Sequence, residues 1–179
     1  MSGIYAVVRD LTSVQQAEMD FLTGLWNRRK FEEKADELLK KAARYDQPLS
    51  LMLLDVDHFK SINDRFGHLH GDEVLKAIAE HLRNTVRGVD VVARWGGEEF
   101  IMLAPETGPE EASMLAERIC SETRKLSFGE LDSVTISIGV TQVGRDEPLD
   151  HAVERADAAL YRAKGEGRDR VVVAETGTE

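Results

Sequence analysis

The sequence predicts an α+β sandwich in which helices pack on one β-sheet, with a core order of β-α-β-β-α-β. The first observation is length and composition: 179 residues, 42% hydrophobic and 31% charged, suit one domain with a filled core. The second is periodicity, because helix-like and strand-like apolar patterns alternate along the chain. The third is a pair of glycines between two apolar runs, which predicts a hairpin within the domain.

The first elements precede the main sheet. Residues 4–9 are typical of a short strand, and residues 12–19 of a helix that follows it. Residues 27–45 place apolar side chains on one helical face, with Asn27 as a plausible N-cap. The apolar run 49–56 predicts the first strand of the main sheet.

Two helices and the hairpin follow that strand. Residues 58–66 predict a short helix that ends at Gly67, and residues 71–86 predict a longer one. Apolar residues on both sides of the glycine pair predict a hairpin over about 89–104, whose turn is Gly96-Gly97.

The last elements complete the alternation. Pro109 opens a helix, since proline is favoured in the first turn. Residues 133–143 alternate as a strand, residues 149–164 predict the final helix, and residues 171–173 predict a last strand. The polar tail, 175–179, is expected to be disordered.

This order of elements is a ferredoxin-like arrangement with additional helices. In it, the first strand lies beside the hairpin in the middle of one sheet. Acidic pairs stand at both places, Asp55 and Asp57 after the strand and Glu98 and Glu99 at the hairpin. Asp55 and Glu98 would then come within reach of one cation, and oxygen ligands of this kind suit Mg²⁺ with nucleotide phosphates. The alternative is that these acids are solvated strand ends.

Charge and cysteine content exclude several classes of protein. The formal net charge is −10, which argues against a nucleic-acid binder or an anionic-membrane binder. The single cysteine, Cys120, allows no disulfide framework. No apolar run reaches the ~18 residues that span a bilayer, and the start of the chain has no signal-peptide pattern. We therefore expect a cytoplasmic protein or a cytoplasmic part of one.

Six stretches in order resemble the GGDEF domain, the diguanylate cyclases that make cyclic di-GMP from GTP. They are DFLTGLWNRR (20–29), LDVDHFKSIND (54–64), GHLHGD (67–72), RWGGEEF (94–100), SIGV (137–140) and ADAALYRAK (156–164). The resemblance implies a fold like that of nucleotide cyclases and polymerase palms over residues 20–174. Residues 1–19 resemble the end of a PAS sensor domain with its linker helix, and the alternative is a native N-terminal extension.

Metal and catalytic residues are implied by the same resemblance. It assigns Asp55, the Val56 carbonyl and Glu98 to Mg²⁺, with Mn²⁺ as a possible replacement, and makes Glu99 a helper in catalysis. The signature carries Glu where the family often has Asp, and either carboxylate can hold the ion. Asp57 stays undecided, because a helix begins beside it.

Substrate contacts are implied too. Asn63 and Asp72 match the positions that contact guanine, although either could instead cap a helix end. The phosphate-contacting positions match the loop at a helix start and two basic residues near the C-terminus. These are His58, Phe59, Lys60, Lys164 and Arg168. Lys164 could also act as a cation at the end of its helix.

A regulatory site is implied by Arg87-Gly88-Val89-Asp90, five residues before Gly96. This matches the inhibitory RxxD site, which binds cyclic di-GMP away from catalysis, and Arg118 resembles a further contact there. The alternative is a surface ion pair. Catalysis in this family needs a transient homodimer of two GTP-loaded monomers. The alternatives in function are a silent module that binds GTP or cyclic di-GMP, and another enzyme on the same palm-like fold.

Overall fold

The computed structural model describes residues 17–129, 131 and 133–174. The expected strand 4–9, most of the expected helix 12–19 and the tail 175–179 lie outside these residues. No helix in the described part is long and apolar enough to cross a membrane. The elements are α2 (Arg28–Tyr45), β1 (Leu49–Val56), α3 (Phe59–Phe66), α4 (His68–Thr85), β2 (Val91–Gly96), β3 (Glu99–Pro105), α5 (Pro109–Thr123), β4 (Ile136–Gln142), α6 (Leu149–Gly165) and β5 (Val171–Val173).

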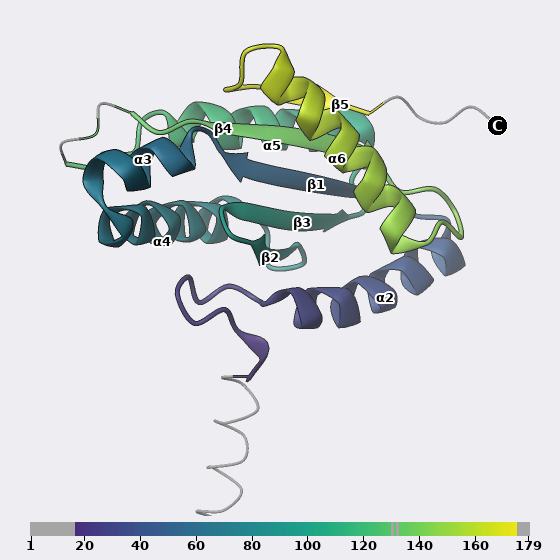
Figure 1. The fold of residues 1–179 in the computed structure, drawn as a ribbon. Helices are drawn as coiled ribbons and strands as arrows, with labels where there is room; N and C mark the ends of the chain where they lie inside the picture. Colours follow the sequence, from purple (N-terminus) through teal and green to yellow (C-terminus); the bar gives the residue numbers. More distant parts are fainter. Residues whose placement is uncertain (1–16, 130, 132, 175–179) are drawn as a thin grey trace, which may run out of the picture.

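The sheet has five strands in the order β2-β3-β1-β4-β5 (Figure 1). β1 lies in the centre and pairs antiparallel with β3 and with β4, while β5 adds a parallel strand beside β4. The predicted β-α-β-β-α-β order and the central first strand are therefore confirmed.

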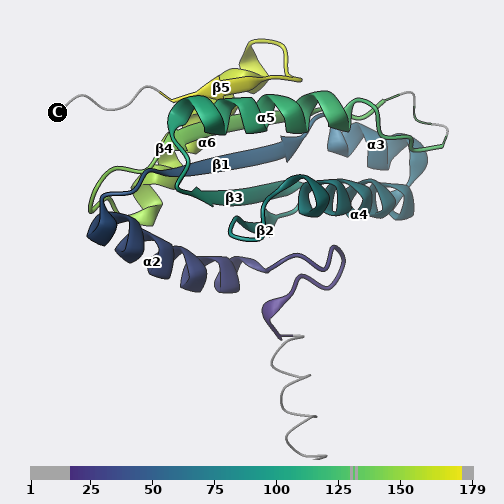
Figure 2. The same ribbon diagram turned by 180° about the vertical axis from the view of Figure 1, so that it is seen from behind.

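Helices cover both faces of the sheet, because β1 is apolar on both sides (Figures 1 and 2). Leu51 and Leu53 belong to the core under α2 and α6. Met52 and Leu54 belong to the core under α4 and α5. Since successive side chains of a strand point to opposite faces, Asp55 falls on the side of α6.

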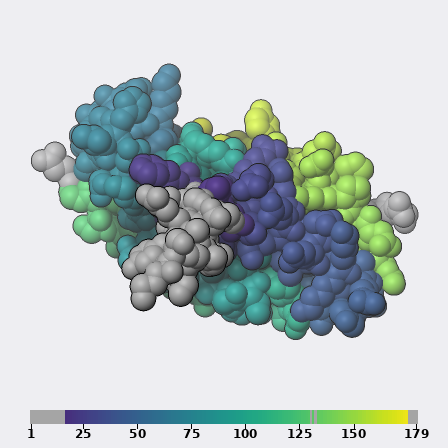
Figure 3. All heavy atoms as spheres, turned by 90° about the horizontal axis from the view of Figure 1, so that it is seen from below, coloured from purple at the N-terminus to yellow at the C-terminus, as the bar shows by residue number. Residues whose placement is uncertain are grey.

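The face below the sheet is crossed by α2 and by the residues that lead into it (Figure 3). Asn27 caps α2, as expected, by accepting a hydrogen bond from the Lys30 N–H at 3.0 Å. Phe31 and Ala35 are fully buried on its inner side. The carbonyl of Trp26 accepts a hydrogen bond from the Arg94 N–H at 3.0 Å, which ties this entry segment to β2.

The backbones of α6 and β4 lie in close contact. A Cβ at Gly139 of β4 would stand 2.1 Å from the carbonyl oxygen of Ala156 and 2.5 Å from the backbone nitrogen of Leu160. Small side chains on α6 allow this approach, and they are buried: Ala152, Ala156, Ala159 and Ala163. The position of α6 over the sheet is thus fixed by main chain against main chain.

Three expected details are wrong. The hairpin turn is Gly97-Glu98, because an irregularity between Arg94 and Gly96 keeps Gly96 paired with Glu99. The helix expected at 71–86 begins at His68, directly after Gly67, whose φ of 87° ends α3. The strand expected at 133–143 begins only at Ile136, which is the last residue that β1 can pair with.

Candidate active site

The two acid pairs meet where β1 passes the hairpin. Asp55 stands opposite Glu99 in the ladder between β1 and β3. The Val56 N–H donates a hydrogen bond to the Glu98 carbonyl at 3.2 Å. Three carboxylates that come from two distant parts of the sequence are therefore held at one end of the sheet by its backbone register.

Burial makes two of these carboxylates, Asp55 and Glu99, hard to ionise. Desolvation raises the pKa of Asp55, and its neighbours Glu98 and Asp57 add to this effect, although an ion pair with Lys164 at 2.9 Å opposes it. Desolvation also raises the pKa of Glu99, with Asp55 as the next cause. Two poorly solvated carboxylates side by side are stabilised by any cation that binds between them.

This site suits a hard divalent cation. The atoms that could ligate such an ion are carboxylate oxygens and the nearby Val56 carbonyl oxygen. Desolvation, followed by the charge of neighbouring carboxylates, raises the pKa of Asp55 and of Glu99, and a bound cation would relieve both effects. In the described part of the chain, no group of three or more His, Cys, Asp or Glu side chains is placed so that it could hold a metal ion. A hard cation that keeps waters and substrate phosphates as ligands needs few ligands from the protein.

Asp57, which the sequence left undecided, is held by hydrogen-bond donors from the start of β4 and from the loop after α6. It is only 4% exposed, and it accepts hydrogen bonds from the hydroxyls of Thr135 and Ser137, both at 2.7 Å. The Asp169 N–H donates a third bond at 3.0 Å. No sequence pattern indicated this role, since the donors come from residues 78 to 112 positions further along the chain.

Asn63 and Asp72 are brought together by α3 and α4. The Asn63 Oδ1 is buried and, among the described residues, has no hydrogen-bond partner. A Cβ at Gly71 would stand 1.9 Å from this oxygen, so Asn63 lies directly against the residue before Asp72. Asp72 does not cap a helix, because α4 begins four residues earlier. The helix-end bond at Asn63 is made by its carbonyl, which accepts from the Gly67 N–H at 2.8 Å.

One of the expected phosphate contacts lies directly beside the acids. Lys164, in the last turn of α6, pairs with Asp55. Within the described residues, Lys60 and Arg168 take part in no ion pair. His58 precedes α3 with a left-handed φ of 55° and provides no side-chain cap, so the first amides of that helix, including Phe59, keep no such partner. Uncapped helical N–H groups and cations are suited to bind an anion.

Arg94 is a site residue that sequence reasoning missed. Its Nη1 lies 3.2 Å from Asp20 Oδ1, and its Nε and Nη2 donate to the Gly97 carbonyl at 3.0 and 2.8 Å. Burial opposes ionisation of Asp20, but hydrogen bonds from Thr23 and the charge of Arg94 lower its pKa. The residue therefore connects the segment before α2 with the turn that carries Glu98. The two partners stand 74 positions apart, so no local pattern could reveal them.

The RxxD residues form a second hollow, of about 590 Å³, which Arg118 also lines. Arg87 Nη2 pairs with Asp90 Oδ1 at 2.9 Å, and the Arg87 N–H donates to Asp90 Oδ2 at 2.8 Å. Arg118 Nη2 donates to the Thr85 carbonyl at 2.8 Å. All three expected residues therefore line one hollow. The ion pair between Arg87 and Asp90, which was the alternative interpretation of the motif, is also present.

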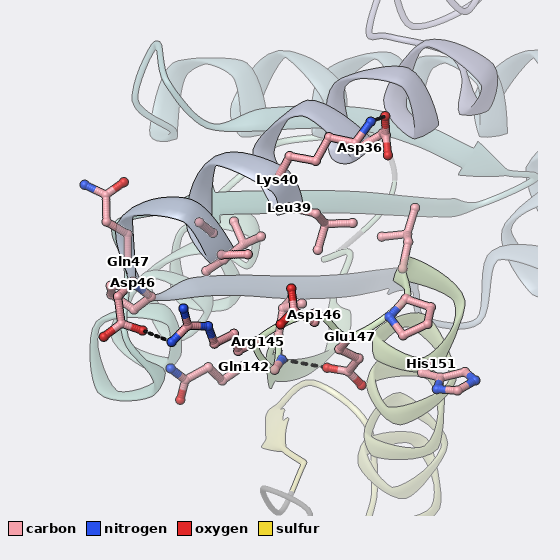
Figure 4. A pocket seen from close by; sticks show the side chains of 18 of the residues that line it. Asp36, Leu39, Lys40, Asp46, Gln47, Gln142, Arg145, Asp146, Glu147 and His151 are labelled. Atoms are coloured by element: carbon pink, nitrogen blue, oxygen red, sulfur yellow. Dashed lines mark hydrogen bonds and ion pairs between the residues drawn. The ribbon is translucent and has the colours of Figure 1, made fainter.

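A larger hollow lies elsewhere. It measures about 1210 Å³ and opens between α2 and the start of α6, where β1 begins rather than where it carries Asp55 (Figure 4). Much of its charged lining is paired internally, for example Arg145 with Asp46 at 3.6 Å and Arg155 with Glu147 at 2.6 Å. It has no part in the site at the hairpin.

A five-stranded palm-like sheet with carboxylates at the junction of β1 and the hairpin defines a nucleotidyltransferase-type domain. The chain belongs to the GGDEF family: residues 17–170 match the family model described as "Diguanylate cyclase, GGDEF domain". This confirms the resemblance drawn from the sequence.

Curated relatives carry the same domain within longer chains. Diguanylate cyclase DgcP of Pseudomonas aeruginosa is 47% identical over 163 residues, which cover 89% of this chain and 24% of that protein. Diguanylate cyclase DgcM of Escherichia coli is 42% identical over 176 residues, 94% of this chain and 43% of that one. The chain therefore spans less than half the length of these relatives.

Solved structures share the fold. The coiled coil and GGDEF domain of DgcB from Caulobacter crescentus, in complex with c-di-GMP, has a TM-score of 0.88 at 31% identity, over 96% of this chain and 93% of that one. The active GGEEF domain of a diguanylate cyclase from Vibrio cholerae has a TM-score of 0.80 at 36% identity, over 84% and 98%. The predicted α+β, palm-like fold is thereby confirmed.

Proposed function

We propose that this domain is a diguanylate cyclase, which condenses two GTP molecules into cyclic di-GMP and releases two pyrophosphates. The observation that carries the proposal is the pair of desolvated acids Asp55 and Glu99, with Glu98 in the adjoining turn and with Lys164 paired to Asp55. Relatives named diguanylate cyclases, similar over most of this chain, support the same chemistry.

Asp55, Glu98 and the Val56 carbonyl would hold Mg²⁺, or Mn²⁺ in its place, and Glu99 would assist. When bound, the ion would neutralise charge on the phosphates and lower the pKa of the attacking hydroxyl. The protein's own contribution is to hold carboxylates at a backbone-defined spacing, in surroundings too poorly solvated for them to ionise easily.

Substrate is held at its two ends. Asp72 would accept from the guanine N–H groups, and the buried Asn63 Oδ1 is an unpaired acceptor beside it. Adenine lacks guanine's donor pair, so such a pocket rejects it. At the other end, Lys164, Arg168 and Lys60 would bind phosphate oxygens, together with main-chain N–H groups of His58 and Phe59.

Chemistry requires two loaded monomers. Each would present its ribose 3′-hydroxyl to the α-phosphate of the GTP on its partner, so that catalysis is chiefly the alignment of two bound substrates. The homodimer would be transient. Residues 1–19, as the end of an upstream PAS sensor with a linker helix, would raise the effective concentration of the two copies in a longer protein. With GTP as its substrate, the domain would act in the cytoplasm.

The RxxD hollow would bind cyclic di-GMP and limit synthesis. Arg87 and Arg118 can bind phosphates or a guanine edge by forked hydrogen bonds, and Asp90 can accept from guanine N–H groups. The hollow is separate from the acid cluster and already joins the three residues around about 590 Å³.

Turnover of GTP by a Glu98→Gln variant tests the proposal. The substitution keeps the shape of the side chain but removes its charge, so cyclic di-GMP formation with Mg²⁺ should fall by at least about a hundredfold. Glu154→Gln, at an exposed position of α6, is the matched control and should keep full activity.

Identification of products by mass separates the alternatives. Binding of GTP without turnover by the unaltered protein would support the silent module instead. A product other than cyclic di-GMP would support a different palm enzyme. Normal turnover by Glu98→Gln would remove the assignment of the metal site.

A further inference from the structure

Asp57 connects the metal-site strand to the loop that follows α6. Its carboxylate is buried and holds three donors, the hydroxyls of Thr135 and Ser137 and the main-chain N–H of Asp169. All three are uncharged, and both carboxylate oxygens are used. A buried carboxylate satisfied in this way makes strong, charge-assisted hydrogen bonds and keeps a defined position.

The loop it holds has an unfavourable backbone conformation. Arg168 and Asp169 follow each other with positive φ angles, 65° and 49°. Non-glycine residues rarely adopt this conformation, so two in succession persist only where surrounding contacts fix them. The Arg168 N–H donates to the Ala163 carbonyl at 2.9 Å, and the next N–H, that of Asp169, is the one bound to Asp57.

A second side chain, Arg124, holds Asp169 from the surface of the molecule, and we call this contact the outer clamp. Arg124, just after α5, places its Nε 2.8 Å from both carboxylate oxygens of Asp169 and its Nη2 3.3 Å from the Asp169 carbonyl. The two side chains are 43% and 34% exposed, so this ion pair is weaker than the buried bond. Asp169 is thus bound through its main-chain N–H by the buried Asp57 and through its side chain by the exposed Arg124.

We propose that Asp57 is a positioning residue for Arg168, with Arg124 as a weaker outer clamp. The inference rests on the proposed function, in which Arg168 binds GTP phosphates. Asp57 follows Asp55 by two residues on the same strand end. Its bond to Asp169 therefore sets the distance between the carboxylate that would hold the metal and the cation that would hold the phosphate.

Binding of a non-hydrolysable GTP analogue tests this assignment. With an α,β-methylene analogue and Mg²⁺, the Asp57→Asn variant should bind about tenfold more weakly, because a charge-assisted bond becomes a neutral one. Binding of guanosine, which has no phosphate, should not change. Hydrogen exchange of the Asp169 amide should accelerate in the same variant, while amides of β1 keep their protection.

Combination with Arg168→Ala shows whether Asp57 acts through Arg168. In the Arg168→Ala background, Asp57→Asn should no longer weaken binding of the analogue, because the side chain that it positions is gone. Arg124→Gln, at an exposed position that cannot prevent folding, should give the same pattern at about two- to threefold. Arg162→Gln removes a comparable exposed ion pair, with Glu166, and is the matched control.

The outcomes are distinct. The positioning role would be overturned if the loss of analogue binding caused by Asp57→Asn or by Arg124→Gln added fully to the loss caused by Arg168→Ala. Equal weakening of guanosine and analogue by Asp57→Asn would also overturn it, since that result indicates a general disturbance of the fold. If Arg168→Ala alone binds the analogue normally, both this inference and the phosphate role in the proposed function fail. If Arg168→Ala weakens binding and Asp57→Asn does not, only this inference fails.

Discussion

Gly71→Ala should damage guanine recognition while leaving the domain folded. The added Cβ would stand 1.9 Å from Asn63 Oδ1 and 3.1 Å from the Cζ of Phe59. Since real Cβ atoms do not approach other atoms within 3.0 Å, the amide oxygen has to move by at least 1.1 Å. A shift of this size breaks any hydrogen bond that Asn63 makes to the base.

The expected loss follows from that displacement. A buried acceptor that loses its partner costs about 1–3 kcal/mol, which is roughly a 5- to 150-fold weaker affinity for GTP. Folding should suffer less, because alanine in place of glycine inside a helix gains up to ~1 kcal/mol, which offsets part of the ~1–3 kcal/mol cost of overpacking. The variant should therefore remain folded and lose substrate affinity.

Steady-state kinetics with GTP and ATP provide the assay. In Gly71→Ala the KM for GTP should rise and the preference for GTP over ATP should fall. Gly108→Ala is the matched control, because a Cβ there makes only an ordinary contact, 3.6 Å from Glu111 Oε2. A folded Gly71→Ala variant with unchanged KM and unchanged preference would show that Asn63 does not contact the base.

Three further predictions concern charge, regulation and assembly. Asp55→Asn should raise the free energy of unfolding at pH 7 in EDTA by on the order of 0.5–2 kcal/mol. Because the pKa of Asp55 is raised in the folded state, the stability that this group contributes is complete below the unfolded value near 3.8 and is lost as the pH rises through the folded value. The gain in the variant should therefore vanish below about pH 4, and an equal gain there would refute the assignment. Arg87→Ala should raise the concentration of added cyclic di-GMP needed for inhibition at least about tenfold. Arg145→Ala, at an exposed arginine elsewhere, is the control. Unchanged inhibition would show that the RxxD pair is only a surface salt bridge. Initial rates at saturating GTP should rise more steeply than linearly with enzyme concentration, and strict proportionality down to nanomolar protein that sediments as a monomer would exclude the two-monomer mechanism.

Much of the fold follows from local patterns in the sequence. Periodicity placed α2, β1, α6 and β5 within a residue or two, because each has a clear apolar face or run. The start of α4 was missed by three residues, since Gly67 ends one helix and lets the next begin without a loop. The turn was shifted by one residue, because an irregular pairing beside Gly96 cannot be read from composition.

Short motifs in the sequence named the residues proposed for the site, but they could not reveal the contacts between those residues. The acids and the glycines stand out as short motifs, and Arg118 was found only through resemblance to a family. The bonds that organise the site join residues far apart, such as Asp57 with Asp169 and Asp20 with Arg94. Their donors have no special spacing, so only the tertiary fold can reveal them.

Gly139 has a consequence for how this domain can change. A side chain at this position would collide with the main chain of α6, which cannot rotate out of the way. The contact therefore fixes the distance from β4 to Lys164. Apolar residues around the helix can be exchanged without altering that length. Any residue larger than glycine at position 139 would displace α6 from the sheet and move Lys164, in its last turn, away from Asp55. The absence of a side chain at Gly139 thus determines whether the proposed phosphate-binding lysine can reach the acids.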